Sequence, residues 1–180
     1  MVNEIYPLGS LPKIGETPKK MYAAVLRQEN YGRPIDAFKI EKVNVPEIGE
    51  NDVLIAVMAA GVNYDGVWAA LGNPVDVIKQ NERRGYKEDY HICGSDASGI
   101  VWAIGEKVDN VAIGDEVVIA CGVWDKNAKD IIGGKDPMES ETAGIWGYDT
   151  NYGSFAQFAL VKDFQCYNKP SHLSWEEASC

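Results

Sequence analysis

The sequence lacks the cysteine and histidine patterns from which protein metal sites are usually built. It has 4 cysteines and 2 histidines in 180 residues. Cys93, Cys121, Cys166 and Cys180 are widely spaced and form no Cys-x-x-Cys pair. His91 and Cys93 lie close together, but no third ligand is evident, and a catalytic zinc ion needs three protein ligands. We therefore expect no metal site, and we expect reduced thiols in a cytoplasmic protein.

The sequence also lacks long apolar runs and an excess of positive charge. No stretch of about 18 apolar residues suggests a transmembrane helix. Residues 1–20 do not read as a basic start followed by an apolar stretch, so no signal peptide is predicted. The 27 acidic residues exceed the 17 basic ones, which gives a net charge of −10. This charge suits neither nucleic acid nor an anionic membrane as a partner.

The composition is that of a globular chain, with 46% hydrophobic residues, and it predicts one domain and perhaps part of a second. Residues 1–20 are interrupted by prolines and glycines, which predicts an extended arm on the body of the protein. Short apolar or alternating stretches predict strands over 21–27, 38–45, 52–62, 97–104, 116–120, 155–161 and 165–168. We expect the strand over 52–62 to be buried on both faces.

Helices are predicted to be few and short. We expect them over 63–71 and 74–81, with a polar segment over 81–90 and a long polar loop over 122–151. Many short strands between glycine-marked turns predict an all-β barrel or sandwich. Ser174 and Glu177 form a capping-box pattern that starts another helix. So short a helix has little stability alone, so we expect more chain or a partner to follow.

The most informative stretch of the sequence follows the apolar strand over 52–62. It carries Asn63, Tyr64 and Asp65, and then Trp68 and Leu71 at helical spacing. Active sites are often built where polar side chains end a buried strand. We therefore take this stretch as the candidate site.

An ordered series of motifs resembles the N-terminal, GroES-like catalytic domain of medium-chain dehydrogenases/reductases. The motifs are Gly-Val-Asn-Tyr-Asp at 61–65, Cys-Gly-Ser-Asp-Ala-Ser-Gly-Ile-Val at 93–101, Gly-Glu-Lys-Val at 105–108, Gly-Asp-Glu-Val-Val at 114–118 and Gly-Ser-Phe-Ala-Gln at 153–157. The resemblance implies a mainly β, partly open GroES-like barrel with short helices over 21–173. It also implies that 174–180 start the helix leading to a Rossmann domain outside these residues. The Gly-x-Gly-x-x-Gly fingerprint of such a domain is accordingly absent here.

The chain looks most similar to crotonyl-CoA carboxylase/reductases and related enoyl-CoA reductases. This likeness rests on Gly-Val-Asn-Tyr-Asp-Gly-Val-Trp at 61–68, the polar insertion at 74–92, and the segments 145–153 and 170–178. It implies NADPH as cofactor, bound mainly by residues beyond Cys180, an acyl-CoA thioester as substrate, and a homodimer or homotetramer. The residues that it implies for the site are Asn63 and Tyr64 at the cofactor, Trp68 at the substrate, and Asp65, Tyr148 and Asp149 around the reacting carbon.

Two departures from related families shape the expected chemistry. Zinc alcohol dehydrogenases carry a thiolate and a His-Glu pair where this chain has Asn63 and then Ser95-Asp96, so we expect a zinc-independent enzyme. Carboxylating relatives typically carry Asn where this chain has Asp65, and Phe-Glu where it has Tyr148-Asp149. An ionised Asp repels the oxygens of CO2, whereas a protonated Asp donates a hydrogen bond or a proton. The resemblance therefore implies an enoyl-CoA reductase that protonates its enolate in preference to carboxylating it.

Plainer interpretations stay open at this point. Asp65 fits a helix N-cap, Trp68 at helical spacing is more typical of a core, and Tyr148 fits a packed loop aromatic. Asn63 fits a residue that bonds backbone groups at the strand end. The alternative functions are a reductive carboxylase, a zinc-free quinone-type reductase and a non-catalytic GroES-like binding module.

Overall fold

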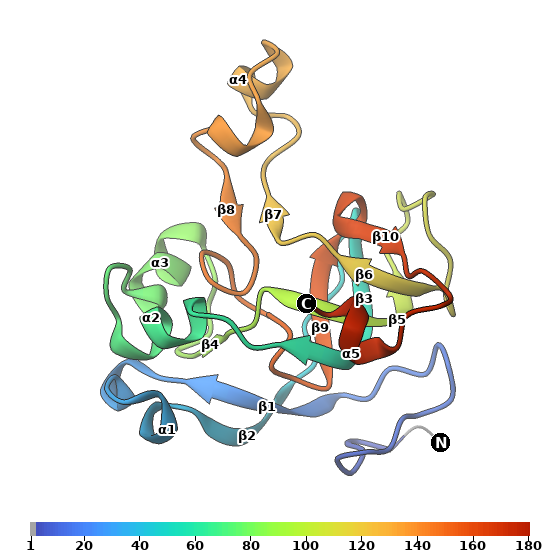
Figure 1. Ribbon diagram of the computed structural model, residues 1–180, viewed down its shortest axis with the longest axis horizontal. Helices are drawn as coiled ribbons and strands as arrows, with labels where there is room; N and C mark the ends of the chain where they lie inside the picture. Colours follow the sequence, from blue (N-terminus) through green and yellow to red (C-terminus); the bar gives the residue numbers. More distant parts are fainter. Residues whose placement is uncertain (1–2) are drawn as a thin grey trace.

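Two antiparallel sheets form the body of the protein, which a computed structural model describes for residues 3–180 (Figure 1). The larger sheet has the strand order β10-β6-β5-β3-β9, and the smaller has the order β2-β1-β4. The strands of the larger sheet are β3 (Asp52–Gly61), β5 (Asp96–Ile104), β6 (Glu116–Ile119), β9 (Phe158–Lys162) and β10 (Cys166–Asn168). Those of the smaller sheet are β1 (Lys20–Leu26), β2 (Lys39–Asn44) and β4 (His91–Ile92). The predicted mainly β fold with short helices is confirmed, and within residues 3–180 the sheets form no closed barrel.

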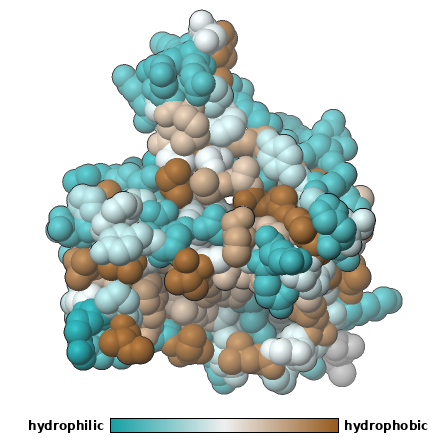
Figure 2. All heavy atoms as spheres, in the orientation of Figure 1, coloured by the Kyte–Doolittle hydropathy of each residue, from teal (hydrophilic) through white to brown (hydrophobic). Residues whose placement is uncertain are grey.

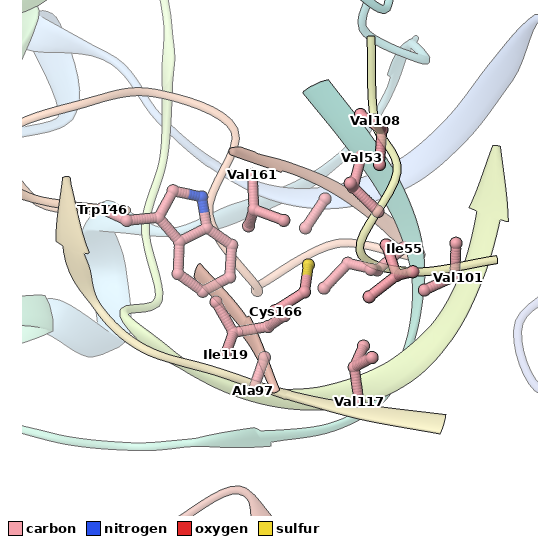
Figure 3. Close-up of a cluster of buried hydrophobic side chains, with 12 residues drawn as sticks. Val53, Ile55, Ala97, Val101, Val108, Val117, Ile119, Trp146, Val161 and Cys166 are labelled. Carbon is pink, nitrogen blue, oxygen red and sulfur yellow. The ribbon is translucent and has the colours of Figure 1, made fainter. Parts of the chain in front are cut away.

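The core of the larger sheet is built from β-branched residues and one tryptophan. Val53, Ile55, Val101 and Val117 are fully buried beside Trp146, whose exposed fraction is 2%. Figure 3 shows the indole at one side of this cluster, with Val161, Ile119 and Cys166 nearer to it than the other labelled side chains. The indole Nε1–H donates to the Leu160 carbonyl at 2.9 Å, so the polar edge of the ring is satisfied inside the core.

Strand β3 runs through the centre of the larger sheet between β5 and β9. Its first half, Asp52 to Ala56, is buried, but Val57 to Gly61 are partly buried and Met58 is exposed. The expectation of burial on both faces along 52–62 is therefore wrong for the second half. The reason is that β9 pairs only as far as Ala56, beyond which the end of β3 is open on that side.

The helices differ from the predicted ones at their ends. Helix α2 covers Asp65–Leu71, and α3 covers Val77–Arg84, three residues further along the chain than predicted. Helix α3 starts late because Asp76 caps it, accepting from the Lys79 N–H at 3.1 Å. It consequently includes the start of the segment 81–90 that was predicted as non-helical. The remaining short helices in this half are η1 (Gln28–Asn30) and α1 (Pro34–Ala37).

The segment 122–151 is not a plain polar loop as predicted, but largely a projecting hairpin. Strands β7 (Gly122–Val123) and β8 (Gly144–Ile145) pair with each other, and the chain between them forms α4 (Lys129–Ile132) and η2 (Pro137–Glu139). Figure 1 shows this hairpin standing away from the sheets, and Figure 2 shows a mainly hydrophilic surface there. Two-residue strands give too short an alternation to be seen in the sequence.

The two ends of the chain lie against the sheets. Residues 3–19 contain no helix or strand, and they accept hydrogen bonds from Trp102 Nε1 at the Glu16 carbonyl and from Gln157 Nε2 at the Tyr6 carbonyl. At the other end, η3 (Asp163–Gln165) precedes β10, and α5 (Trp175–Ala178) follows it. The domain boundaries expected at 20 and 173 stay predictions. No helix among residues 3–180 has the length and apolar character needed to span a membrane.

The predicted capping box at the start of α5 is confirmed. Ser174 Oγ accepts from the Glu177 N–H at 3.1 Å, and Glu177 Oε2 accepts from the Ser174 N–H at 2.9 Å. Helix α5 also packs on the larger sheet, because Ser98 Oγ donates to the Trp175 carbonyl at 2.6 Å. The helix thus lies beside the end of β3, where the candidate site begins.

Candidate active site

The side chain of Asn63 organises the end of strand β3. Its Nδ2 donates to Ser95 Oγ at 2.6 Å and to Asp96 Oδ2 at 2.5 Å, while its Oδ1 accepts from the Asp65 backbone N–H at 2.9 Å. One sequence interpretation has Asn63 bonding backbone at the strand end, but the backbone N–H that it bonds lies at the start of α2. Its amide also joins the chain after β3 to the start of β5. This network brings Asp65 and Asp96 to the same side of the sheet end.

Asp65 is the first residue of α2 and does not cap it. The N-cap position is Tyr64, and no side chain makes a cap hydrogen bond there. The Asp65 carboxylate instead accepts from Ser95 Oγ at 3.4 Å. Burial raises the pKa of Asp65 above its usual value, the Ser95 hydrogen bond opposes this, and the charges of Asp96 and Asp149 raise the pKa further. At any given pH this carboxyl is therefore protonated more often than an exposed Asp.

Tyr148 and Asp149 lie on a tight turn that follows β8. The backbone N–H of Asp149 donates to the Ile145 carbonyl at 2.7 Å, and Asp149 Oδ2 accepts from the Ile145 N–H at 2.8 Å. Asp149 thus closes the turn with both its backbone and its carboxylate. The other oxygen of that carboxylate makes none of the hydrogen bonds found among residues 3–180.

The hydroxyl of Tyr148 is buried and has no hydrogen-bond partner among residues 3–180. Burial raises the pKa of Tyr148, and the negative charges of Asp149 and Asp65 add to this effect, while the nearby backbone N–H of Val75, which can only donate to the hydroxyl oxygen, opposes it. The hydroxyl therefore stays protonated at neutral pH and is a hydrogen-bond donor without an acceptor. Buried polar groups are nearly always paired, so an orphaned hydroxyl indicates a place where a ligand or water supplies the acceptor.

Three aromatic rings form a row beside these carboxylates. The ring centroids of Tyr64 and Trp68 are 5.3 Å apart, and those of Trp68 and Tyr148 are 6.3 Å apart. Tyr148 is buried, but Trp68 is 40% exposed and Tyr64 is 63% exposed. Trp68 is therefore not the core residue that its helical spacing alone favours. The row offers an apolar surface that leads from solvent to the orphaned hydroxyl.

The donor set at the end of β3 does not suit a zinc ion. Asn63, Ser95 and Asp96, which the motif resemblance assigns to zinc-ligand positions, bond to one another and contribute a single carboxylate. Among residues 3–180 no group of three or more His, Cys, Asp or Glu side chains lies close enough to hold a metal ion. Each of the four cysteines is a free thiol. A catalytic zinc ion requires three protein ligands, usually Cys, His or carboxylate side chains, and these residues provide neither the types nor the number.

The sequence reasoning brought six residues to one site, and the structure adds two more. Asn63, Asp65, Tyr148 and Asp149 meet around the end of β3, with Tyr64 and Trp68 along the aromatic row. Ser95, which was considered only as a missing zinc ligand, bonds both Asn63 and Asp65. Cys121 also lies near: burial raises the pKa of its thiol, and the charges of Asp96 and Asp65 add to this effect. No sequence pattern indicated Cys121, since its position depends on where β6 ends.

A large cavity lies outside this site. It has a volume of about 630 Å³ and lies between the projecting hairpin and the start of β3, with Trp124, Lys126 and Phe164 among its lining residues. Lys126 pairs with Asp163 at 3.0 Å, and Lys162, also in the lining, pairs with Asp52 at 2.6 Å. Their charges are thus neutralised within the protein, and the cavity presents no unpaired cluster of one sign.

The comparisons with known proteins agree with the geometry. Residues 49–171 match the family model of the alcohol dehydrogenase GroES-like domain. The chain belongs to this family. A curated relative in Cereibacter sphaeroides, crotonyl-CoA carboxylase/reductase, is 51% identical over 98% of this chain and 40% of its own length. A crotonyl-CoA reductase of Streptomyces avermitilis is 41% identical over 81% of this chain and 34% of its own length. The chain therefore spans less than half the length of the curated relatives it matches.

The three-dimensional structure of this GroES-like domain is also similar to solved structures. The crotonyl-CoA carboxylase/reductase AntE in complex with NADP has a TM-score of 0.92 and 54% identity, and the match covers 99% of this chain and 44% of that one. The 2-octenoyl-CoA carboxylase reductase CinF, in complex with NADP and 2-octenoyl-CoA, has a TM-score of 0.83 and 32% identity, covering 91% of this chain and 40% of that one. This GroES-like domain thus resembles the N-terminal part of these enzymes, as the sequence motifs implied.

Proposed function

We propose that the protein is a zinc-independent, NADPH-dependent enoyl-CoA reductase that protonates its enolate in preference to carboxylating it. Acryloyl-CoA and crotonyl-CoA are the proposed substrates. The observation that carries the proposal is the buried, unpartnered hydroxyl of Tyr148, whose pKa the charges of Asp149 and Asp65 help to raise. The likeness to crotonyl-CoA carboxylase/reductases supports the substrate class and the cofactor.

The residues at the end of β3 fit the nicotinamide part of an NADPH molecule that is held mainly by chain beyond Cys180. The exposed side chains of Val62 and Tyr64 offer apolar surface to a flat ring, and Asn63 lies between them. When bound, NADPH supplies a hydride to the β carbon of the enoyl thioester. This GroES-like domain then has two tasks. It holds the resulting enolate, and it controls whether a proton reaches the α carbon of that enolate.

Tyr148 and Asp65 fit these two tasks. The neutral Tyr148 hydroxyl donates a hydrogen bond to the polar edge of the substrate without carrying charge into the buried site. Asp65, with its raised pKa, has a larger protonated fraction than an exposed carboxyl and faces the same region, so it serves as the proton donor. Ser95 holds the Asp65 carboxylate in place by its hydrogen bond.

The charge of the site disfavours CO2 capture. Asp65, Asp96 and Asp149 lie near enough that the charges of the other two add to burial in raising the pKa of Asp65. The oxygens of CO2 carry partial negative charge, so ionised carboxylates around the α carbon repel it, whereas a neutral amide would donate a hydrogen bond to it. The charges of Asp96 and Asp149 also raise the protonated fraction of Asp65, and so favour its transfer of a proton to the enolate.

The decisive test is the product that the full-length protein makes. It is incubated with NADPH, crotonyl-CoA and ¹³C-bicarbonate in the presence of carbonic anhydrase, and the acyl-CoA products are separated by mass spectrometry. We expect mainly butyryl-CoA. A predominance of ¹³C-labelled ethylmalonyl-CoA would overturn the preference for protonation, and the absence of any enoyl-CoA-dependent NADPH oxidation would overturn the reductase assignment.

A reductive carboxylase is the second candidate. It is favoured by the names of the relatives, since the protein of Cereibacter sphaeroides and AntE are both crotonyl-CoA carboxylase/reductases. The proposed assay separates the two candidates directly, because they differ only in whether the label enters the product.

We also propose a homodimer or homotetramer. The projecting hairpin supports this, because Ile132 near its tip is 73% exposed and Met138 is 50% exposed. Light scattering of the full-length protein, alone and with Ile132→Asp, tests it. A wild-type mass of one chain contradicts the proposal.

A further inference from the structure

A fully buried histidine lies behind the turn that carries Tyr148 and Asp149. His91, in β4, has no exposed surface, and it bonds through both ring nitrogens. Its Nε2 lies 3.1 Å from the Gly147 carbonyl oxygen, and its Nδ1 lies 3.1 Å from Asn81 Nδ2. The sequence reasoning considered this residue only as a metal ligand, and it belongs to no such group among residues 3–180.

The two contacts fix the protonation state of the ring. A carbonyl oxygen only accepts, so Nε2 must carry the proton that bonds Gly147. Nδ1 then has a free lone pair and accepts from the Asn81 amide. Burial lowers the pKa of His91 to about 4, although the Gly147 carbonyl opposes this. At neutral pH the ring is therefore an uncharged, single-tautomer bridge between α3 and the turn.

Gly147 is the residue of the turn that His91 contacts. Its φ is +72°, a left-handed conformation that suits glycine, and a Cβ at this position would clash with the Gly94 carbonyl oxygen. The residue therefore packs directly against the chain between β4 and β5. Its carbonyl belongs to the peptide plane that leads into Tyr148, so a bond that fixes this carbonyl also fixes the direction in which Tyr148 leaves the backbone.

The same peptide group is also held from its other side, because the Tyr148 N–H donates to the Ile145 carbonyl at 3.2 Å. The other side-chain restraints on the turn act elsewhere. Asp149 bonds Ile145 within the turn itself. Asn151, after the turn, accepts from the Ile92 N–H at 2.8 Å and donates to the Tyr90 carbonyl at 3.0 Å. Among the side-chain hydrogen bonds of residues 3–180, only that of His91 reaches the peptide group immediately before Tyr148.

We propose that His91 is a positioning residue, which, as a neutral Nε2–H tautomer, holds the Gly147 carbonyl and so orients the Tyr148 hydroxyl and the Asp149 carboxylate in the site. It does not touch the substrate. The expected effect on kcat rests on the proposed function. The effect on the orientation of Tyr148 does not, because that orientation can be measured without turnover.

The test compares three variants of the full-length protein. His91→Leu removes both ring contacts at similar volume, and His91→Gln retains an amide N–H at about the position of Nε2. Val117→Ala is the control for a loss of core packing, because Val117 shares a buried cluster with Trp146 but makes no side-chain hydrogen bond to the turn. We expect kcat with crotonyl-CoA to fall at least 10-fold in His91→Leu, KM to change less than about 3-fold, and His91→Gln to recover most of the loss. Val117→Ala should lower the melting temperature with kcat unchanged well below the transition.

A second measurement reads the orientation directly. The proteins are labelled with 3-fluorotyrosine, and Tyr148→Phe assigns the resonance of Tyr148. We expect that resonance to shift or broaden in His91→Leu, to resemble wild type in His91→Gln, and to be unchanged in Val117→Ala. An unchanged Tyr148 resonance in a folded His91→Leu protein overturns the proposal. So does a loss of kcat in Val117→Ala as large as that in His91→Leu at equal melting temperature. If wild type has no reductase activity, the proposed function fails, while the fluorine spectra still decide the role of His91.

Discussion

Asn63 Oδ1 accepts a hydrogen bond from the backbone N–H of Asp65 at 2.9 Å, so the amide that ends strand β3 also sets the first turn of the helix carrying the carboxylate. The other end of the same amide donates to Ser95 and Asp96. One side chain therefore fixes how β3, α2 and β5 meet. The site that results has a carboxyl group on a helix start and a buried hydroxyl whose pKa it helps to raise, and among residues 3–180 no metal-binding group is found.

Asp65→Asn is expected to shift the products of the full-length enzyme toward carboxylation. The substitution removes one negative charge and one proton donor, and adds an N–H that bonds a CO2 oxygen. We expect the ratio of carboxylated to reduced product to rise by about 3- to 10-fold, because a single changed charge contact is worth about 1 kcal/mol. Mass spectrometry with ¹³C-bicarbonate measures the ratio. The exposed Asp109→Asn is the control, and a ratio that moves equally in both variants contradicts a specific role of Asp65.

Tyr148→Phe is expected to lower activity without lowering stability. The hydroxyl has no partner among residues 3–180, so its removal breaks no hydrogen bond and spares the cost of burying it. We expect the free energy of unfolding to stay within about 0.5 kcal/mol of wild type or to rise. Tyr31→Phe is the contrasting control, because Tyr31 donates to Asp76 Oδ1 at 2.9 Å, and it should cost about 1–2 kcal/mol. Urea unfolding gives both values, and an equal loss in the two variants argues that Tyr148 has an unseen partner.

Acid is expected to destabilise the protein partly through His91. Its pKa is lowered from 6.5 to about 4 in the folded state, so the unfolded chain binds the proton more readily. The stability due to the neutral ring is complete above pH 6.5 and is lost as the pH falls toward 4, amounting to about 3 kcal/mol at most.

The measurement is urea unfolding of wild type and His91→Gln at several values between pH 7 and pH 4.5. Carboxyl groups titrate in both proteins, so their difference isolates the histidine. We expect the difference in unfolding free energy to shrink as the pH falls. A difference that stays constant with pH shows that His91 has an ordinary pKa in the folded protein.

Gly147→Ala is expected to be much more damaging than an alanine at another left-handed glycine. Gly85 has a φ of +88° and open space where a methyl group would lie, so Gly85→Ala costs only the backbone strain of about 1–2 kcal/mol. At Gly147 the methyl would also clash with the Gly94 carbonyl oxygen, and we expect a loss of about 3 kcal/mol or more. Thermal unfolding compares the two variants. Equal losses indicate that the contact with Gly94 relaxes freely.

Most of the strands and the order of the motifs could be read from the sequence. Strand β5 was predicted over 97–104 and covers Asp96–Ile104, and the predicted strand over 116–120 is β6, Glu116–Ile119. Continuous or alternating apolar runs decide such strands locally. The strand β4 was missed, since two residues cannot show a period, and the hairpin within 122–151 was missed for the same reason.

The sequence indicated residues that come together at the end of β3 but not how they bond, and their roles in a site stay predictions. The residues Asn63, Asp65, Tyr148 and Asp149 were chosen through motif resemblance, because a long stretch of sequence separates the first two from the last two. Local pattern left Asp65 open as a helix cap and favoured Trp68 as core, and both interpretations are wrong. The reason is that Asn63 occupies the backbone N–H next to the helix start, and Trp68 lies at the open end of β3.

The sequence by itself determined that this protein is mainly β, that its candidate site begins where an apolar strand ends, and that the zinc-binding side chains are missing. These are properties of residue type and short-range periodicity. Only the tertiary structure decided that Tyr148 is buried without a partner among residues 3–180, that burial and two neighbouring carboxylates raise the pKa of Asp65, and that His91 bridges α3 to the turn before Tyr148. Such features depend on contacts between segments far apart in the chain, and no local pattern encodes which polar atom is left without a bond.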